Sequence, residues 1–466
     1  MFRKIPFCAK KLKLLFHKIA VPLHPLKVKG KMKFVLRLLS VLLLQSATMT
    51  AQTERKMTVD DLFNLIEQNS KTLLTKKTSV EMADKNIASA KSQRLPDINT
   101  SLSVSYLGDI FMTDRDFSNY EGYSSPHLGN TFALEAQQVV YAGGAIDAGV
   151  RLAELQKQQA EIGTSLTRQQ LRFTTLGGYL DLCKIANRIQ VYEKNIELTQ
   201  QLIEDIKAKQ QEGMALKNDI TRYELQMQTL RLELTKLQNQ RSIINHQLCN
   251  TLGLDENTVI IPDATIADNK YGKDGEAHWQ NNAIFNAPAL KNSNLQKQVA
   301  EQNVKLAKSE MLPKVAVVAA DNFNGPITTM VPPINKNLNA WYVGVGIKYS
   351  ISSLFKSNHK VQQARLASRQ SNELYDVTAE SVNNAVQSAY TNYQQSYVEL
   401  ETQQKNVQLA AQNYEVVNSR YLNQLALITD MVDASNIKLR AELQEVDARI
   451  NIVYAYYKLC YIAGSI

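Results

Sequence analysis

The sequence of 466 residues contains few cysteines, only four, and few histidines, only six. Cys183, Cys249 and Cys460 lie far apart, and Cys8 lies in the first 51 residues, which we expect to be removed. Three scattered cysteines cannot form a disulfide framework in a chain of this size, and no histidine stands at metal-ligand spacing from them. We therefore expect three buried free thiols and no metal site.

A catalytic motif is also absent. The six histidines are His17, His24, His127, His246, His278 and His359. None of them forms a nucleophile or metal pattern with a nearby serine or acid. Gly272 and Gly275 neither follow a strand nor precede a phosphate-binding helix, so they do not indicate a nucleotide-binding loop. The sequence therefore predicts that the protein is not an enzyme and has no cofactor.

A basic surface is missing as well, although the formal net charge is +9. Eleven of the 53 Lys and Arg residues lie in residues 1–51, which contain no Asp or Glu. The rest of the chain carries 42 basic against 44 acidic residues and is nearly neutral. This balance argues against nucleic acid as a partner, because phosphate backbones are bound by basic patches.

Residues 1–51 have the composition of a leader with a signal peptide. Basic residues flank and enter an apolar run, 34–44, which is followed by small residues up to Ala51. The run is too short to span a bilayer as a helix, which takes roughly 20 residues. We predict export and cleavage near Ala51. Met1 and Met32 are both possible starts, and the basic composition of the 31 residues before Met32 favours the later one.

The rest of the chain is an internal duplication. A shift of 211 residues, without a gap, aligns identical residues in the two halves. The aligned pairs include Tyr179 with Tyr390, Asn195 with Asn406, Ala215 with Ala426, Asp219 with Asp430, Leu248 with Leu459, Cys249 with Cys460 and Gly253 with Gly464. Such agreement indicates a repeated structure. We assign residues 52–265 to the first repeat, 266–282 to a linker and 283–466 to the second repeat.

Each repeat has the order helix, strand, strand, long helix, helix. Leu, Ile and Val recur every three or four residues among polar residues, which is the period of an amphipathic helix. The expected helices span about 57–94, 145–211 and 217–252 in the first copy and about 285–311, 354–422 and 428–463 in the second. The longest reach on the order of 100 Å at 1.5 Å per residue. Polar helices of this length favour a coiled-coil wall over a globular core.

Short segments with alternating side chains lie between the helices. The expected strands span about 97–107, 131–141, 313–321 and 340–351. In the first, for example, Ile98 and Leu102 share one face and Asn99 and Ser103 the other. Each segment is about ten residues long, which suits a strand that crosses a bilayer at a tilt. The aromatic residues near the strand ends, expected at the membrane interfaces, are Tyr106, Tyr141, Trp341 and Tyr349.

Four strands are too few to close a barrel, so two interpretations stay open. In one, several copies of the chain contribute four strands each to a barrel in lipid, where every strand edge must be paired. The loops at about 107–130 and 323–339 then lie outside the cell. In the other, the strands form a small soluble sheet of a secreted coiled-coil scaffold or adhesin. The predicted signal peptide and the apolar faces favour the barrel, although Gln138 interrupts the face of segment 131–141.

The chain resembles the TolC-like outer-membrane efflux protein family, the outer membrane factors, over essentially all of residues 57–466. The resemblance rests on the duplicated plan, on "RLP" and "MLP" before the first strand of each copy, on "VVYAGG" ending at Gly144 and on "SRYLNQLALITDMVDA". It implies a mainly α protein with a small β part. It further implies a homotrimer whose 12-stranded β-barrel continues as a 12-helix α-barrel tunnel, located in the outer membrane of a Gram-negative bacterium with a long periplasmic extension.

The resemblance also implies a function and partners. It predicts the passive exit duct of a tripartite efflux or type I secretion system, which exports small molecules or polypeptides. The expected partners are a periplasmic adaptor protein, an inner-membrane RND or ABC transporter and the lipid of the outer membrane. The exported cargo and the transporter class stay open, because a wide polar lumen selects little.

The turns between the long helices and the helices that follow them are the expected contacts with the adaptor. They contain Gly213, Met214 and Ala215 in the first copy and Gln424, Leu425 and Ala426 in the second. Similar proteins carry a glycine at each turn, and Gln424 replaces it in the second copy. Ala426 replaces an arginine that is usual two residues later. The sequence therefore does not determine which contacts gate the channel.

Two carboxylates after the second turn, Asp430 and Asp433, match the acidic residues that ring the periplasmic entrance in similar proteins. Threefold symmetry would place six carboxylates around a narrow opening, where they attract cations. The alternative is helix-start chemistry, since acids in a first turn stabilise a helix. Asp430 has Asp219 as its counterpart, so either role fits. Asp433 has Arg222 as its counterpart and is therefore the stronger candidate for a pore residue.

Overall fold

The computed structural model describes residues 53–268, 271–272 and 274–466, and residues 54–466 form one compact unit. The expected leader, its cleavage site at Ala51 and both candidate start residues lie outside the described residues. Among the helices that are described, none is both long enough and apolar enough to cross a membrane.

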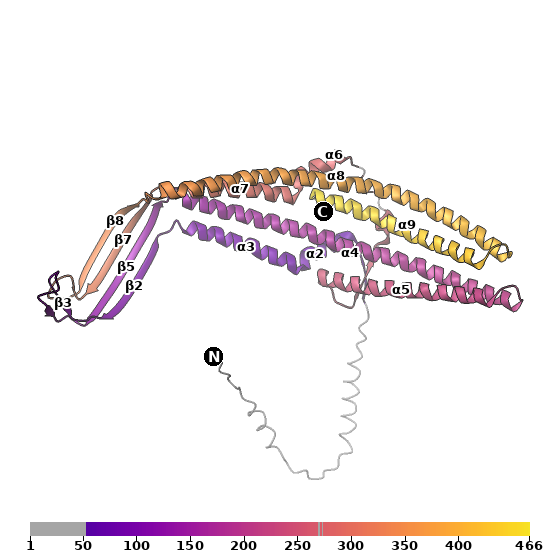
Figure 1. Ribbon diagram of the computed structural model, residues 1–466, viewed down its shortest axis with the longest axis horizontal. Helices are drawn as coiled ribbons and strands as arrows, with labels where there is room; N and C mark the ends of the chain where they lie inside the picture. Colours follow the sequence, from indigo (N-terminus) through magenta and orange to yellow (C-terminus); the bar gives the residue numbers. More distant parts are fainter. Residues whose placement is uncertain (1–52, 269–270, 273) are drawn as a thin grey trace, which may run out of the picture. The chain divides into compact units, whose positions relative to one another are not determined.

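The helices form two sets that match in order and length (Figure 1). The first set is α2 (Val59–Asn69), α3 (Lys71–Ser92), α4 (Ala145–Gln211) and α5 (Lys217–Leu252). The second set is α6 (Glu276–Asn286), α7 (Pro288–Ser309), α8 (Ser353–Leu422) and α9 (Ile428–Ala463). Their lengths are 11, 22, 67 and 36 residues against 11, 22, 70 and 36. Three of the four pairs have equal lengths and the fourth differs by three residues, as expected for a duplicated sequence.

The expected helix 57–94 is two helices, which corrects the prediction. α2 begins after Thr58, whose hydroxyl accepts the N–H of Asp61 while the Asp61 carboxylate accepts the N–H of Thr58. At Ser70 the backbone is extended, and the Ser70 hydroxyl caps α3 by accepting the N–H of Leu73 at 3.3 Å. No proline or glycine marks this break, and the only local signal is Ser70, a residue type that is favoured at helix starts but common elsewhere.

The second half contains the same break. Ala287 has an extended backbone, and Pro288 begins α7 as its first residue, a position that proline favours. α6 therefore begins within the expected linker 266–282 and ends inside the expected helix 285–311. A linker assignment missed this helix because its length is only three turns.

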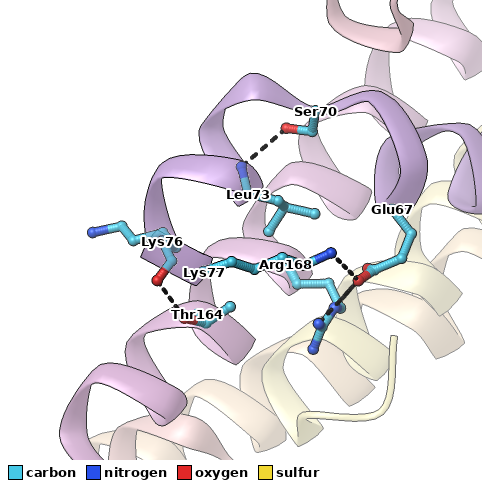
Figure 2. Close-up of polar contacts among 7 residues, drawn as sticks. All are labelled: Glu67, Ser70, Leu73, Lys76, Lys77, Thr164 and Arg168. Atoms are coloured by element: carbon cyan, nitrogen blue, oxygen red, sulfur yellow. Dashed lines mark hydrogen bonds and ion pairs between the residues drawn. The ribbon is translucent and has the colours of Figure 1, made fainter. Parts of the chain in front are cut away.

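Polar contacts fix the two short helices α2 and α3 on α4, as Figure 2 shows. Arg168 donates from Nε and Nη2 to the two carboxylate oxygens of Glu67, at 2.7 and 3.1 Å, and Lys77 Nζ lies 3.6 Å from the same carboxylate. The hydrogen bonds from Arg168 are the main reason that the pKa of Glu67 lies below its usual range. The hydroxyl of Thr164 donates to the Lys76 carbonyl oxygen at 3.5 Å. These contacts connect both sides of the break to the same long helix.

The two largest apolar cores each centre on one half of the chain. The first packs α2, α4 and α5 with β1 (Thr53–Met57) and β6 (Thr258–Pro262), which form a two-stranded sheet, and it also takes in Ile450 and Val453 of α9. The second packs α6 and α7 with α8 and α9. Equivalent residues occupy equivalent places, since Leu248 lies in the first core and Leu459 in the second.

The three cysteines in the described residues are free and buried, which confirms the prediction. Cys249 and Cys460, an aligned pair, lie in the first and second cores. Burial raises the pKa of the Cys183 thiol to about 12. All three therefore act as small apolar side chains.

A four-stranded antiparallel sheet has the order β2 (Asp97–Tyr106), β5 (Leu128–Tyr141), β7 (Lys314–Gly325), β8 (Leu338–Lys348). The two strands of each repeat are thus joined into one sheet across the repeats by the β5–β7 pair. A short hairpin of β3 (Ile110–Met112) and β4 (Glu121–Tyr123) lies in the loop between β2 and β5. In Figure 1 the sheet lies at one end of α4 and α8, and the turns that lead into α5 and α9 lie at the other.

Candidate functional site

The four-stranded sheet has one apolar face that no other described element covers. Directly paired residues of an antiparallel sheet share a face, and the pairs on this face include Leu102 with Phe132 and Val317 with Val345. Leu102 and Trp341 are each 73% exposed, and every residue of β2 is exposed. Burial of such surface is worth roughly 25 cal/mol per Å². A face of this kind indicates contact with lipid or protein.

The opposite face of the sheet is polar and lined by small side chains. In β2 it carries Asn99, Ser101 and Ser103, and in β8 it carries Gly344 and Gly346. A methyl group added at Gly344 would meet no atom within 4 Å. This face is therefore open and hydrophilic, in contrast to the apolar face.

The structure places the four predicted interface aromatics at the two ends of the apolar face. Tyr106 ends β2 at the end of the sheet away from the helices and stacks on His127, with ring centroids 5.1 Å apart. Tyr141 ends β5 at the helix side, and Tyr349 directly follows β8 there. Along β8, Trp341 and Tyr349 lie about 26 Å apart at 3.3 Å per residue. That length matches the apolar band of about 25 Å in outer-membrane barrels.

β5 is longer than its sequence suggested, because it spans Leu128–Tyr141 and the expected segment began at 131. Gln138 lies on the apolar face, but its side chain donates a hydrogen bond to the Arg94 carbonyl oxygen at 2.6 Å. The ladder to β7 shifts its register between Val139 and Tyr141. Hydrogen bonding to β2 and β7 therefore keeps this segment in a strand, although Gln138 interrupts its apolar face.

The turns at the far ends of the two helical hairpins have the same backbone. Gly213 has φ 78° and Gln424 has φ 62°, so the glutamine adopts the left-handed conformation expected of glycine. In both turns the following residue closes the helix end, since the Met214 N–H donates to the Lys209 carbonyl oxygen and the Leu425 N–H to that of Arg420, each at 2.8 Å.

Large apolar side chains are exposed at these two tips. They are Met214, Leu216, Leu422, Leu425 and Leu427, of which Leu216 and Leu427 are each 70% exposed. Between the tips lies a cavity of about 590 Å³, whose lining includes Lys209, Asp219 and Arg222. The cavity combines an apolar wall with two cationic side chains and one carboxylate.

Asp430 has a structural role at the start of α9. Its carboxylate accepts the N–H of Leu427 at 3.1 Å, just as the Asp219 carboxylate accepts the N–H of Leu216 at 3.2 Å in the first half. Asp433 lies one turn further along and is exposed. The helix-start interpretation thus accounts for Asp430 and not for Asp433.

A row of polar contacts between α4 and α9 was not foreseen. Lys184 Nζ donates to the Asn451 side chain at 2.8 Å, and Arg188 forms a two-point ion pair with Asp447. Further toward the tips, Asn195 Nδ2 donates to Glu442 at 3.1 Å. The spacing of these residues on each helix, four to seven positions apart, was a usable signal. The row fastens the second hairpin to the first.

Over the described residues, no three His, Cys, Asp or Glu side chains are grouped to hold a metal ion. Two surfaces stand out in the described part of the chain: an uncovered sheet face and a pair of helix tips. Together with the long helical hairpins, they fit the class of outer-membrane channel proteins.

The chain belongs to the outer membrane efflux protein family, whose sequence model matches residues 62–254 and 279–465. It is 19% identical over 430 residues to the outer membrane efflux protein BepC of Brucella suis biovar 1 (strain 1330), which covers 91% of this chain and 89% of BepC. The family resemblance inferred from the sequence is thereby confirmed, and with it the location in the outer membrane.

Solved structures share the fold at low sequence identity. CusC has a TM-score of 0.74 at 14% identity, with 88% of this chain and 92% of CusC covered. The outer membrane protein VceC of Vibrio cholerae has a TM-score of 0.71 at 14% identity, with 87% of this chain and 96% of VceC covered. The similarity extends over helices and sheet together.

Proposed function

We propose that three copies of this chain form the outer-membrane exit duct of a tripartite efflux system, a passive channel without chemistry of its own. The observation that carries this proposal is the uncovered apolar face of the sheet together with its two free edges, β2 and β8. Exposed strand edges are not tolerated in lipid, where every backbone N–H and C=O must be paired. Three copies supply twelve strands, which is within the range of closed barrels.

The polar face of the sheet then faces the lumen. Its serine, asparagine and glycine residues suit a water-filled channel, and the apolar face contacts lipid. α4 and α8, each with 67 or more residues, continue the barrel as the walls of a helical tunnel. Helices of on the order of 100 Å are long enough to extend well into the periplasm.

The hairpin tips are the proposed contact with a periplasmic adaptor protein. Gly213, Met214 and Ala215 form the first tip and Gln424, Leu425 and Ala426 the second. Exposed leucines beside Lys209 and Arg222 in one cavity favour a partner segment with apolar side chains and an acid. An inner-membrane transporter of the RND or ABC class supplies the energy through that adaptor, in either a drug-efflux or a type I secretion assembly.

Asp433 is the proposed pore residue, with Asp430 behind it on the same helix. A ring of Asp433 side chains would select for cations at the tunnel entrance. Single-channel conductance in planar bilayers tests this role: Asp433→Asn should lower the cation preference. Asp219→Ala is the matched control for Asp430→Ala, because it removes the same helix-start contact from the other hairpin. Unchanged ion selectivity in Asp433→Asn would contradict the pore assignment.

A secreted coiled-coil scaffold is the competing function. It requires the apolar sheet face to be covered by protein in water, and no described element of the chain covers it. Fractionation separates the two: we expect an outer-membrane oligomer of three chains that needs detergent for extraction. A detergent-free soluble monomer would overturn the exit-duct proposal.

A further inference from the structure

The two free edges of the sheet carry opposite charges at their helix-side ends. β2 begins at Asp97 and β8 ends at Lys348. Both side chains are exposed, and over the described residues neither has a hydrogen bond or an ion pair. Asp97 lies on the polar face with Asn99, and Lys348 lies on the same face with Gly346. Each edge therefore presents one charge without a partner, on the face assigned to the lumen.

Lys348 is moreover in an unfavourable position within its own chain. It pairs directly across the sheet with Lys314, and like charges at directly opposed positions destabilise a sheet. The Glu310 carboxylate, which interacts electrostatically with Lys314, already accepts a hydrogen bond from Lys360 Nζ at 2.8 Å. A carboxylate supplied from outside the chain would relieve this repulsion.

The register of the sheet indicates where such a carboxylate would lie. The row of paired residues that starts at Asp97 runs through Gln137 and Val318 to Gly344, four positions before Lys348. In a closed barrel of identical copies, the same row continues on the next copy with a fixed offset along the strand. Side-chain alternation requires this offset to be an even number of residues.

Strand tilt restricts the offset further. With about 4.8 Å between strands and about 3.3 Å per residue, offsets of two, four and six residues per four strands give tilts of about 19°, 35° and 46°. Outer-membrane barrels have tilts of about 35–45°. From Asp97 to Gly344 the row moves four residues away from the helix-side strand ends, so the offset continues in that direction. Asp97 of the next copy therefore lies opposite Lys348 or two residues beyond it, at Ser350. Both positions are within reach of the long Lys348 side chain.

We infer that Asp97 of one copy forms an ion pair with Lys348 of the next copy and that this pair sets the register in which the sheets join. The inference rests on the proposed exit duct, because it requires closure of the barrel by copies of the same chain. Lys314 adds a second cation beside the same carboxylate. The occupant of each edge is thus the opposite edge of an identical chain.

Charge reversal tests the pair. Asp97→Lys and Lys348→Asp should each weaken the oligomer, measured as a lower temperature at which it dissociates in SDS. The double variant Asp97→Lys with Lys348→Asp should recover most of the loss. The matched control is Asp97→Lys with Lys336→Asp, which has the same net charge but places the new acid in the outer loop, and it should not recover.

Cysteine cross-linking tests the proximity independently. Asp97→Cys with Lys348→Cys should give disulfide-linked oligomers on oxidation, whereas Ile98→Cys with Lys348→Cys should not, because Ile98 faces the other side of the sheet. The three native thiols in the described residues are buried, so they should contribute little cross-linking of their own.

The outcomes separate the two proposals. Rescue by the double charge reversal, with cross-linking at 97 and 348, supports the ion pair. A stable wild-type oligomer that shows neither rescue nor cross-linking overturns the ion pair and leaves the exit duct in place. A wild-type chain that is monomeric in the outer membrane overturns both.

Discussion

The two halves of the chain are nearly equal in their helices and differ at the tips of their hairpins. α5 and α9 each have 36 residues, and both end in a left-handed glycine, Gly253 with φ 65° and Gly464 with φ 79°. At the tips, the first half has Gly213 and Arg222 where the second has Gln424 and Asp433. The backbone is thus repeated, and so are the exposed leucines Leu216 and Leu427, whereas the side chains at these two positions differ.

This comparison separates structural residues from candidates for function. Asp219 and Asp430 occur in both halves and make the same hydrogen bond to the N-cap backbone, so the fold explains both. Asp433 and Arg222 occupy equivalent positions with opposite charge, and the fold explains neither. Residues that differ between equivalent positions are therefore the better places to look for a role in the entrance or in docking.

The largest expected effect is the loss of stability on truncating an aligned pair of buried leucines, which tests whether the two cores are equivalent. Leu248 is 5% exposed and Leu459 is fully buried. Truncation of a buried leucine to alanine costs about 2–5 kcal/mol, so we expect Leu248→Ala and Leu459→Ala each to lower the midpoint of chemical unfolding in detergent. Leu225→Ala, at a residue 65% exposed, is the control with little effect. A cost at only one of the two leucines would show that the halves are not equivalent.

A smaller effect distinguishes the two helix-ending glycines. A methyl group at Gly464 would lie 2.5 Å from the Asn286 carbonyl oxygen, whereas one at Gly253 would lie 2.9 Å from the Asn69 Cβ, on a side chain. Both alanine variants adopt the left-handed conformation at a cost of about 1–2 kcal/mol. We expect Gly464→Ala to be the more destabilising in thermal unfolding, because the Asn286 backbone can move away from the added methyl group less easily than the Asn69 side chain can.

The control for the glycine pair is Gly149→Ala, within α4, where an added methyl group meets no atom within 4 Å. Alanine is favoured over glycine in a helix interior by about 1 kcal/mol, so this variant should be stable. Equal costs at Gly253 and Gly464 would contradict the assigned clash with Asn286.

Exchanging glycine and glutamine at the two hairpin tips should change the stability of the two hairpins in opposite directions. Gln424 adopts a left-handed backbone that glycine adopts without strain, so Gln424→Gly should stabilise the second hairpin by about 1 kcal/mol, and Gly213→Gln should destabilise the first by a similar amount. Hydrogen exchange at the tip amides measures each hairpin separately. Gln424→Asn, which tolerates this conformation better, should lie between. Destabilisation by Gln424→Gly would mean that the Gln424 side chain makes a contact that outweighs the strain.

Much of this architecture could be predicted because its signals are repeated along the chain. The helix periods and the alternation in the strands are local signals. Aligned residues such as Cys249 and Cys460 also allowed the elements predicted in one half to be checked against those predicted in the other. The break at Ser70 could not be predicted, because serine is compatible with helix and only the packing against α4 selects the extended backbone. The left-handed backbone of Gln424 could not be predicted either, because the tight turn imposes a conformation that glutamine disfavours.

The candidate site divides in the same way. The sequence indicated the apolar and polar strand faces and the aromatic residues at the strand ends, because period-two patterns determine faces. It did not indicate which edges stay free, because that depends on the order β2-β5-β7-β8, in which paired residues of β5 and β7 are 174 to 195 positions apart. Only that order shows that Asp97 and Lys348 lie on the two edge strands of the sheet.

The smallest expected effect concerns the ion pair between Glu67 and Arg168, which has no counterpart among the described residues of the second half. Glu67 in α2 is held by Arg168, and its pKa is lowered by that hydrogen bond from an ordinary value of 4.5. Because the folded pKa lies below the unfolded one, the stabilisation is fully present above pH 4.5 and is lost as the pH falls through the folded pKa. Both side chains are about one third exposed, so the contribution is on the order of 1 kcal/mol.

We therefore expect Glu67→Gln to lower the unfolding midpoint slightly at pH 7 and to match the wild type at a pH well below 4.5. Glu197→Gln, at an exposed carboxylate of α4, should change neither value. Because Ile284 of α6 stands where α2 has Glu67, the second half should show no comparable loss in acid. Hydrogen exchange at low pH that loosened α6 before α2 would contradict this assignment, since it would place the acid-sensitive contact in the other half of the chain.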